Sequence, residues 1–313
     1  MVVNSLEKVI INNSEQWLLV RGENPDAPLI IHVQAGPGLP IIPEANSMDK
    51  MLQLEKHYLV AYWDQRGCGK SFNSSLDAKT INFSQLTDDI ISCTRYLLKK
   101  FKKDKAVIIG YSIGASISLM AATKDSSIFD RLFLVGLDID IPTANRYAIE
   151  FLISGAKDNK RQLKQAFKLS KEPITNTISF QKRAKLLADL GGIKMGSSYN
   201  NILMTTILNM LTCKAYRLSD IPRTIKGMEF CQNALLPQLE SLNLFESIKS
   251  VDVPVHFVQG KKDGIAPYQT SAEYYYFLQA DEKSFSSFDN SAHMPHYEES
   301  EKFSQLIKET INA

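Results

Sequence analysis

Ala106-Val107-Ile108-Ile109-Gly110-Tyr111-Ser112-Ile113-Gly114-Ala115-Ser116 is the stretch of sequence that decides the fold. Its first four residues are apolar, and three of them, Val107, Ile108 and Ile109, favour strands, which predicts a buried strand of a parallel sheet. The residues that follow, Ala115–Thr123, are small and mostly apolar and predict a helix. Between strand and helix lies the pattern G-x-S-x-G, which in this context is typical of a sharp turn that exposes a serine.

The predicted turn gives Ser112 the surroundings of a nucleophile. The serine has to adopt a strained backbone conformation that lifts its Oγ clear of the sheet, and the flanking glycines leave room where strand and helix cross. The N-terminus of the helix supplies N–H groups and the positive end of a dipole, where an oxyanion would develop. The alternative is that so short a pattern arises by accident, so the rest of the chain has to decide.

The composition is that of an ordinary globular protein. The chain has 313 residues, of which 44% are hydrophobic and 22% are charged, and its formal net charge is +2. This length suits one large α/β domain or two smaller domains. A charge so close to zero gives no reason to expect a nucleic acid or a membrane surface as a partner.

The cysteines and the apolar segments indicate a protein of the cytoplasm. The four cysteines have no spacing typical of a zinc site or a disulfide framework, so we expect reduced thiols and no metal or other cofactor. The N-terminus has neither the basic start nor the apolar core of a signal peptide. The longest apolar candidate, Ile202–Leu211, is too short to span a bilayer.

Strands alternate with helices over the first 140 residues, which predicts a mostly parallel, doubly wound α/β sheet. The alternation stops at Asp138-Ile139-Asp140-Ile141-Pro142, and the chain is then predicted to be helical as far as residue 247. A strand pattern returns at Val255–Gln259. We therefore expect an α/β core formed by residues 1–140 and 248–313, and a helical lid, residues 141–247, over the carboxyl edge of the sheet.

The predicted lid carries a run of basic residues. The run consists of Lys157, Lys160, Arg161, Lys164, Lys168 and Lys171. We interpret it as a solvated helix face, and the alternative is a surface that steers anionic substrates.

Two loops after predicted strands have unusual sequences. Gln34-Ala35-Gly36-Pro37-Gly38 predicts a loop in which the backbone approaches another group closely. Beside a nucleophile turn such a loop supplies the second oxyanion N–H, and the alternative is a simple tight turn. Asp64–Ser71 is glycine-rich but lacks the spacing of a phosphate-binding loop. We expect Asp64 and Arg66 to form an internal ion pair or to brace this loop.

A serine nucleophile needs a general base within hydrogen-bond reach. Three of the five histidines lie inside or at the start of predicted strands: His32, His57 and His256. His293 follows the last predicted strand, at the sheet edge that carries Ser112, so we assign His293 as the base. His296, three residues later, is the alternative.

The base in turn needs an acid that fixes its tautomer. Asp263 lies in a glycine-flanked loop at the end of the preceding strand and suits this role, with Asp138 and Asp140 as rivals. The chain order Ser112, Asp263, His293 is that of α/β-hydrolases and differs from the orders in chymotrypsin and subtilisin.

Together these motifs resemble the proline iminopeptidase-related family of α/β-hydrolases over nearly the full chain. The stretches that carry the resemblance are Gln34–Gly38, Asp64–Ser71, Gly110–Gly114, Gly260–Asp263 with Pro267, and Ser291–His293. The resemblance implies that Ser112 is the nucleophile, His293 the base and Asp263 the orienting acid. It also implies that the amides of Gly36 and Ile113 form the oxyanion hole.

The sequence departs from the family pattern at three places. Gln34 and Ala35 replace the family's His and first Gly, and Tyr111 and Ile113 replace the Gly and Trp beside the nucleophile. Family peptidases bind the α-amine of the substrate with lid carboxylates, and the nearest candidate in this lid is Glu229.

We therefore expect a serine hydrolase with an acyl-enzyme mechanism, namely an aminopeptidase for short peptides or aminoacyl amides. One alternative is an esterase or amidase for small acyl substrates. Another is a protein that binds a ligand on this fold without turnover. Epoxide hydrolases and haloalkane dehalogenases are disfavoured, since they use a carboxylate where this chain has Ser112.

Overall fold

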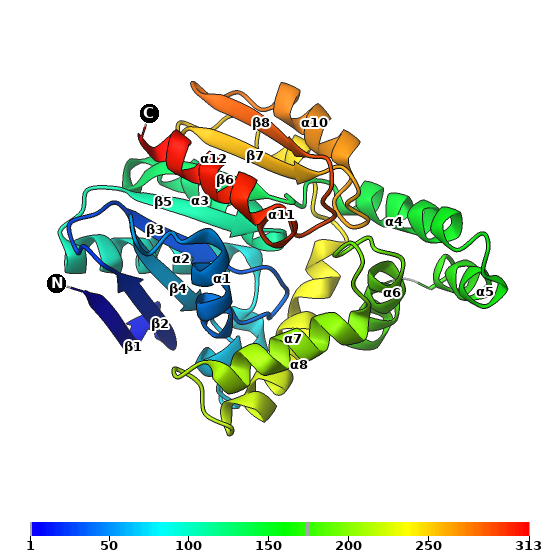
Figure 1. Cartoon of the computed structure of the whole chain (residues 1–313), viewed down its shortest axis with the longest axis horizontal. Coiled ribbons are helices and arrows are strands. Elements are labelled where there is room, and N and C mark those ends of the chain that lie inside the picture. Colours follow the sequence, from blue (N-terminus) through cyan, green and yellow to red (C-terminus); the bar gives the residue numbers. More distant parts are fainter. Residues whose placement is uncertain (1, 173, 175, 313) are drawn as a thin grey trace.

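The computed structural model describes residues 2–172, 174 and 176–312, and it is built around one eight-stranded sheet (Figure 1). The strand order is β1-β2-β4-β3-β5-β6-β7-β8. β2 pairs antiparallel with both β1 and β4, and every other pair of neighbours is parallel. The strands are β1 (Val3–Ile11), β2 (Ser14–Gly22), β3 (Leu29–Val33), β4 (Leu59–Asp64), β5 (Ala106–Tyr111), β6 (Phe129–Val135), β7 (Val255–Gly260) and β8 (Lys283–Phe288).

The central strands are buried on both faces, as their continuous apolar sequences predict. Every residue of β3, β4 and β5 is buried, whereas exposed and partly buried positions alternate along most of the edge strand β1. In β3, Leu29 and Ile31 pack into one hydrophobic cluster and Ile30 packs into a second. The period of two along the strand thus divides the core into two layers.

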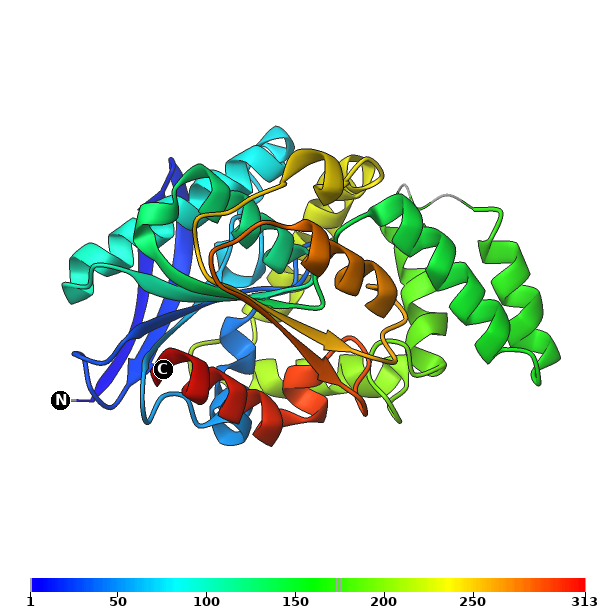
Figure 2. The same cartoon turned by 90° about the horizontal axis from the view of Figure 1, so that it is seen from above.

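Helices cover both faces of the sheet (Figure 2). On one face lie α2 (Phe83–Phe101), α3 (Ile113–Lys124) and α10 (Tyr268–Phe277), and on the other lie α1 (Ala45–Leu52) and α12 (Ser300–Asn312). Short helices complete the core: η1 (Ile42–Glu44), η2 (Gly69–Ser71), η3 (Ala78–Thr80), η4 (Ser126–Ile128) and α11 (Pro295–Glu298). The predicted doubly wound sheet is confirmed.

The chain between β6 and β7 forms a further group of helices, which we call the helical insert (residues 141–247). Figure 1 shows these helices to the right of the sheet and below it. The helices are α4 (Ile141–Gly155), α5 (Lys160–Leu169), α6 (Thr177–Asp189), α7 (Tyr199–Thr212), α8 (Asp220–Leu239) and α9 (Leu244–Ser247). The basic residues of the run at Lys157–Lys171 are all exposed, which agrees with a solvated helix face.

Asp64 ties the insert to the sheet. Its carboxylate accepts hydrogen bonds from the backbone N–H groups of Ile41, Ile42 and Lys70, and from the Tyr216 hydroxyl of the insert. The expected pair of Asp64 with Arg66 is wrong. The guanidinium of Arg66 instead pairs with Asp89 of α2 at 2.7 Å, while both carboxylate oxygens of Asp64 accept the other hydrogen bonds. Asp64 is therefore a loop brace.

None of the helices in the described part of the chain has both the length and the apolar composition that crossing a membrane requires. The four cysteines are free and buried.

Candidate active site

Five strands that are consecutive in the sheet each end beside the same edge. In the order β3, β5, β6, β7 and β8, the loops after these strands carry Gly36, Ser112, Asp138, Asp263 and His293. Because the five strands are parallel to one another, their carboxyl ends meet at one edge. The topology therefore gathers residues that lie far apart in the sequence.

Ser112 occupies a strained turn between β5 and α3. Its backbone angles are φ 52° and ψ −126°, a region that residues with a side chain rarely adopt. Its N–H bonds the carbonyl of Val135 in β6 at 2.8 Å, which holds the turn against the sheet. Position 114, in the first turn of α3, requires glycine. A Cβ there would lie 2.1 Å from the carbonyl oxygen of Gln34. The predicted strand–turn–helix context of Ser112 is thus present.

The two predicted oxyanion residues lie next to each other. A Cβ on Gly36 would lie 3.4 Å from Cγ2 of Ile113. Ile113 is the first residue of α3, so its N–H has no partner within the helix. The N–H of Gly36 has no acceptor among the described residues. Two N–H groups without an acceptor among the described residues therefore line the same cavity as Ser112, one at the start of α3 and one in the loop after β3.

Asp263 holds the ring of His293. Nδ1 of His293 donates to Oδ2 of Asp263 at 2.8 Å. The same oxygen accepts from Nε2 of Gln259 at 2.9 Å, while Oδ1 accepts from the N–H groups of Ile265 and Ala266 at 2.8 and 2.9 Å. With all four bonds made, the carboxylate is fixed in place, and the proton on Nδ1 leaves Nε2 of the imidazole as an acceptor.

The pKa of His293 is raised above its ordinary value of 6.5. Burial acts in the opposite direction and would lower this pKa, but the charge and the hydrogen bond of Asp263, together with the charges of Asp138 and Glu298, outweigh it. The imidazole is therefore more basic than a histidine in water, which suits a proton acceptor near neutral pH.

The hydroxyl of Ser112 donates to a second carboxylate. Its Oγ lies 3.0 Å from Oδ2 of Asp138, which is 6% exposed in the loop after β6. Burial raises the pKa of Asp138 to about 6, against the lowering effect of His293 and of the hydrogen bond from Ser112. The sequence places Asp138 at the correct edge but suggests it only as a partner of the base. In the structure it contacts the predicted nucleophile.

The rivals of Asp263 and His293 have other tasks. The carboxylate of Asp140 accepts from the N–H and the hydroxyl of Thr143 and so caps the N-terminus of α4. The ring of His296 packs against Tyr111 and Tyr297, each with its centroid 4.4 Å away. Burial lowers the pKa of His296 well below 6.5. Neither residue is arranged like the pair of Asp263 and His293.

The remaining histidines lie away from this chemistry. Nδ1 of His32, in β3, is 2.9 Å from the hydroxyl of Tyr111, and Nδ1 of His256, in β7, is 2.8 Å from the hydroxyl of Ser284. His57 is exposed in the turn before β4. His32 and His256 are thus buried residues of the core strands.

Two cavities meet at Ser112 and His293, and both residues line both of them. The first, about 240 Å³, is lined mainly by apolar side chains, many of them on α4, α6 and α8, and we call it the Arg183 cavity after its cationic residue. The second, about 230 Å³, we call the Glu44 cavity. There the carboxylate of Glu44 accepts from Asn209 at 2.6 Å and from Tyr297 at 2.9 Å. The site therefore has room on two sides of the nucleophile.

The proposed amine-binding glutamate of the insert is not at either cavity. Glu229 is exposed on α8 and is absent from the lining of both. The carboxylates that do line the cavities are Asp138 and Glu240 in the first and Glu44 in the second. Among the described residues, no group of three or more His, Cys, Asp or Glu side chains is arranged to hold a metal ion.

Sequence comparisons agree with this architecture. The family model described as "alpha/beta hydrolase fold" matches residues 28–300. A Bacillus subtilis (strain 168) protein named "Probable aminopeptidase YbaC" is 26% identical over 319 residues, which cover 96% of this chain and 94% of that protein.

Solved structures give the same result for the fold. A proline iminopeptidase-related protein of Thermus thermophilus is similar with a TM-score of 0.70 and 18% identity, covering 99% of this chain and 98% of its own. The proline iminopeptidase of Mycobacterium smegmatis gives 0.69 and 14%, covering 98% of both chains. Together these matches confirm the fold class and the family resemblance that the sequence motifs predict.

Proposed function

Because this chain belongs to the alpha/beta hydrolase fold family, we propose that it is a serine hydrolase with Ser112 as nucleophile, His293 as base and Asp263 as the acid that orients it. The observation that carries the proposal is the common edge of the sheet. There the strained Ser112 turn and the hydrogen-bonded pair of His293 and Asp263 come together, and Ser112 and His293 line the same cavities.

The mechanism follows from the hydrogen bonds. The Ser112 hydroxyl turns from Asp138 toward Nε2 of His293, which accepts its proton while Oγ bonds the carbonyl carbon of the substrate. The N–H groups of Gly36 and Ile113 stabilise the resulting oxyanion. The imidazolium then gives its proton to the leaving group, and an acyl-enzyme remains. Water, deprotonated by the same ring, attacks the ester and releases the acid and Ser112.

We further propose that the substrate is an aminoacyl compound, as the names of the relatives suggest, and that Asp138 receives its α-amine. An α-nitrogen lies about 2.5 Å from the carbonyl carbon, and the attacking Oγ approaches that carbon to about 3–3.5 Å. A carboxylate oxygen 3.0 Å from Oγ is therefore within reach of the ammonium. The ammonium also offsets the repulsion between Asp138 and the developing oxyanion.

The insert would act in this scheme as a lid, residues 141–247 over a core of residues 1–140 and 248–313. The support for this role is that residues of the insert make up most of the lining of the Arg183 cavity, chiefly on α4, α6 and α8. Closing such a cavity excludes water from the acyl-enzyme and strengthens the interactions inside it.

An esterase or amidase for small acyl groups is the second candidate. It is favoured by the apolar walls of the Arg183 cavity and by the exposure of Glu229, since a neutral acyl chain needs no carboxylate. A protein that only binds ligands is favoured by one observation, the hydrogen bond of Ser112 to Asp138 in place of His293.

The test compares L-alanyl-4-nitroanilide with its N-acetylated form. We expect turnover of the free amine and a kcat/KM at least about 100-fold lower for the acetylated compound, because acetylation removes the charge that Asp138 binds. Asp138→Asn should remove most of this preference. Asp140→Asn is the matched control, because asparagine also caps a helix and the loss of charge occurs two residues away.

Equal turnover of the two anilides would overturn the aminopeptidase assignment and favour the amidase. Tight binding of both without product would favour the ligand-binding protein.

A further inference from the structure

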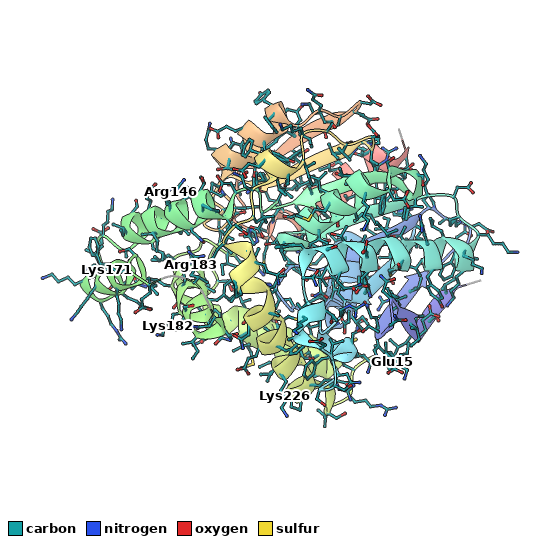
Figure 3. All side chains as sticks on the ribbon, turned by 180° about the vertical axis from the view of Figure 1, so that it is seen from behind. Glu15, Arg146, Lys171, Lys182, Arg183 and Lys226 are labelled. Carbon is teal, nitrogen blue, oxygen red and sulfur yellow. The ribbon has the colours of Figure 1, made fainter. Side chains whose placement is uncertain are left out.

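Arg183 is a cation in a cavity whose other walls are mainly apolar. It lies on α6 and lines the cavity that also contains Ser112. Figure 3 locates Arg183 within the helical insert, with Lys171 and Lys182 nearer the outer edge of the molecule. Its side chain is only partly exposed, whereas Lys182, its neighbour in sequence, is exposed and does not line the cavity. The two adjacent cations therefore have different surroundings.

The guanidinium of Arg183 is incompletely paired within the chain. Its one hydrogen bond runs from Nη2 to Oδ1 of Asn145 at 2.6 Å, so four of its five N–H groups have no partner among the described residues. No described carboxylate lies within 4.0 Å of it, although Asp138 and Glu240 line the same cavity. Its charge is therefore balanced only by solvent or by a molecule in the cavity.

A cation in such surroundings is costly unless an anion joins it. Burial lowers the pKa of Arg183 to about 10, which leaves the group charged at neutral pH. Buried charges in proteins are generally paired, because contacts with apolar neighbours do not offset the free energy of removing an ion from water. The planar fork of an arginine matches the two oxygens of a carboxylate.

We propose that Arg183 binds a carboxylate of the substrate, with Asn145 holding the guanidinium in position. The inference rests on the proposed function and narrows it: the substrates are acyl or aminoacyl compounds that carry a second, anionic group. The reacting carbonyl lies at Ser112, the carboxylate at Arg183, and the apolar walls contact the chain between them. The carboxylate has two possible sources, an acidic side chain on the acyl part or the C-terminus of a short peptide.

A binding measurement tests Arg183 without any turnover. Calorimetry would compare hexanoate with hexanamide, which share an apolar chain that suits the cavity walls. We expect wild type to bind hexanoate about 10- to 100-fold more tightly than hexanamide. This ratio corresponds to the free energy of a hydrogen bond between charged groups. Arg183→Gln should abolish this difference, and Arg183→Lys should restore part of it. Lys182→Gln removes the same charge one residue away and should retain the wild-type preference.

A turnover measurement identifies the source of the carboxylate. One pair is L-glutamyl- and L-glutaminyl-4-nitroanilide, and the other is alanylglycine and alanylglycine amide. We expect wild type to prefer the acidic member of one pair by about 10-fold or more in kcat/KM, chiefly through KM. In Arg183→Gln that preference should vanish, whereas Lys182→Gln should retain both the preference and the hydrolysis of the neutral member.

The outcomes separate this inference from the proposed function. Hydrolysis of the neutral compounds, with no preference for an acid in either measurement, would overturn the role of Arg183 and keep the hydrolase. Preference for hexanoate that depends on Arg183, without hydrolysis of any amide, would support the carboxylate site and overturn the proposed aminopeptidase. An equal loss of all binding in Arg183→Gln and Lys182→Gln would show that the charge acts at long range only, and would contradict the inference.

Discussion

The edge of the sheet and the helical insert surround the same two cavities, but they are built differently. At the sheet edge the polar groups are bound to one another: the carboxylate of Asp263 makes four hydrogen bonds, and Ser112 and His293 each have a carboxylate partner. In the insert the walls are mainly apolar, and Arg183 has one hydrogen bond.

This difference separates two tasks. Positions on neighbouring strands are fixed by the register of the sheet and by close backbone contacts, so a hydroxyl and an imidazole can be held in one arrangement. Positions on the insert depend on how separate helices pack, and they form a surface that a substrate contacts. We infer that the sheet edge sets the reaction and that the insert sets its substrate.

Loss of the nucleophile should have the largest effect. Ser112→Ala removes the Oγ that is proposed to form the acyl-enzyme and should lower kcat by about 10⁶-fold. Hydrolysis of the best anilide, followed by absorbance, measures this loss. Stability in urea serves as the control, since a small side chain is replaced by a smaller one. An active Ser112→Ala enzyme would mean that the sheet edge does not carry the reaction in the way described.

Loss of the orienting acid should have the next largest effect. Asp263→Asn keeps the shape of the side chain but removes the charge that holds the proton on Nδ1 of His293. A fall of about 10⁴-fold in kcat is expected when the imidazole is no longer fixed in the required tautomer. Asp138→Asn should have a much smaller effect on a substrate without an amine. Similar losses of kcat in the two variants would contradict our assignment of Asp263, and not Asp138, as the acid that orients His293.

Filling the gap beside the turn should disturb the oxyanion donors. Gly114→Ala places a Cβ 2.1 Å from the carbonyl of Gln34, so the loop that carries Gly36 has to move. We expect a loss of about 10²–10³-fold in kcat, as for removal of one oxyanion donor. The melting temperature should fall as well. Gly155→Ala, where a Cβ meets only ordinary contacts of 3.4 Å or more, is the control and should be active.

The pH dependence tests the charges around the base. The proposed mechanism needs His293 unprotonated, so kcat/KM should fall as the pH drops through the pKa of the imidazole. Because that pKa is raised, the midpoint of the acid limb should lie above 6.5. Asp138→Asn removes one of the charges that raise it and should move the midpoint to lower pH. A shift to higher pH in this variant would contradict the geometry.

The smallest effect is expected on the exposed face of the insert. Lys160→Gln with Lys164→Gln removes two charges from the solvated face of α5, away from both cavities. Stability should change by no more than about 0.5 kcal/mol, and kcat/KM for the glutamyl anilide should stay within about twofold. A drop of tenfold or more that weakens in high salt would instead support steering of anionic substrates by this face.

The same comparison explains what the sequence can predict. Ser112, Asp263 and His293 lie in the loops or turns that follow parallel strands, and parallel strands bring such positions to one edge, so local motifs are enough to place them together. The contact of Ser112 with Asp138 is not predictable in this way. It depends on where the loop after β6 turns, which no local pattern specifies.

The inner face of the insert is harder to predict. Arg183 sits among other basic residues and resembles a solvated position. However, Phe180, Ala184 and Leu187 also line the cavity, and with Arg183 they follow the spacing of one helix face. That spacing is the signal by which Arg183 can be found. Local resemblance favours Glu229, but the packing of α8 turns it outward.

Covalent labelling tests the central claim most directly. Wild-type protein treated with a fluorophosphonate should gain one equivalent of the probe, found by peptide mass spectrometry on Ser112. The reaction should slow below the pKa of His293 and be far slower in Asp263→Asn. Labelling of another residue, or equal labelling of wild type and Ser112→Ala, would contradict the account.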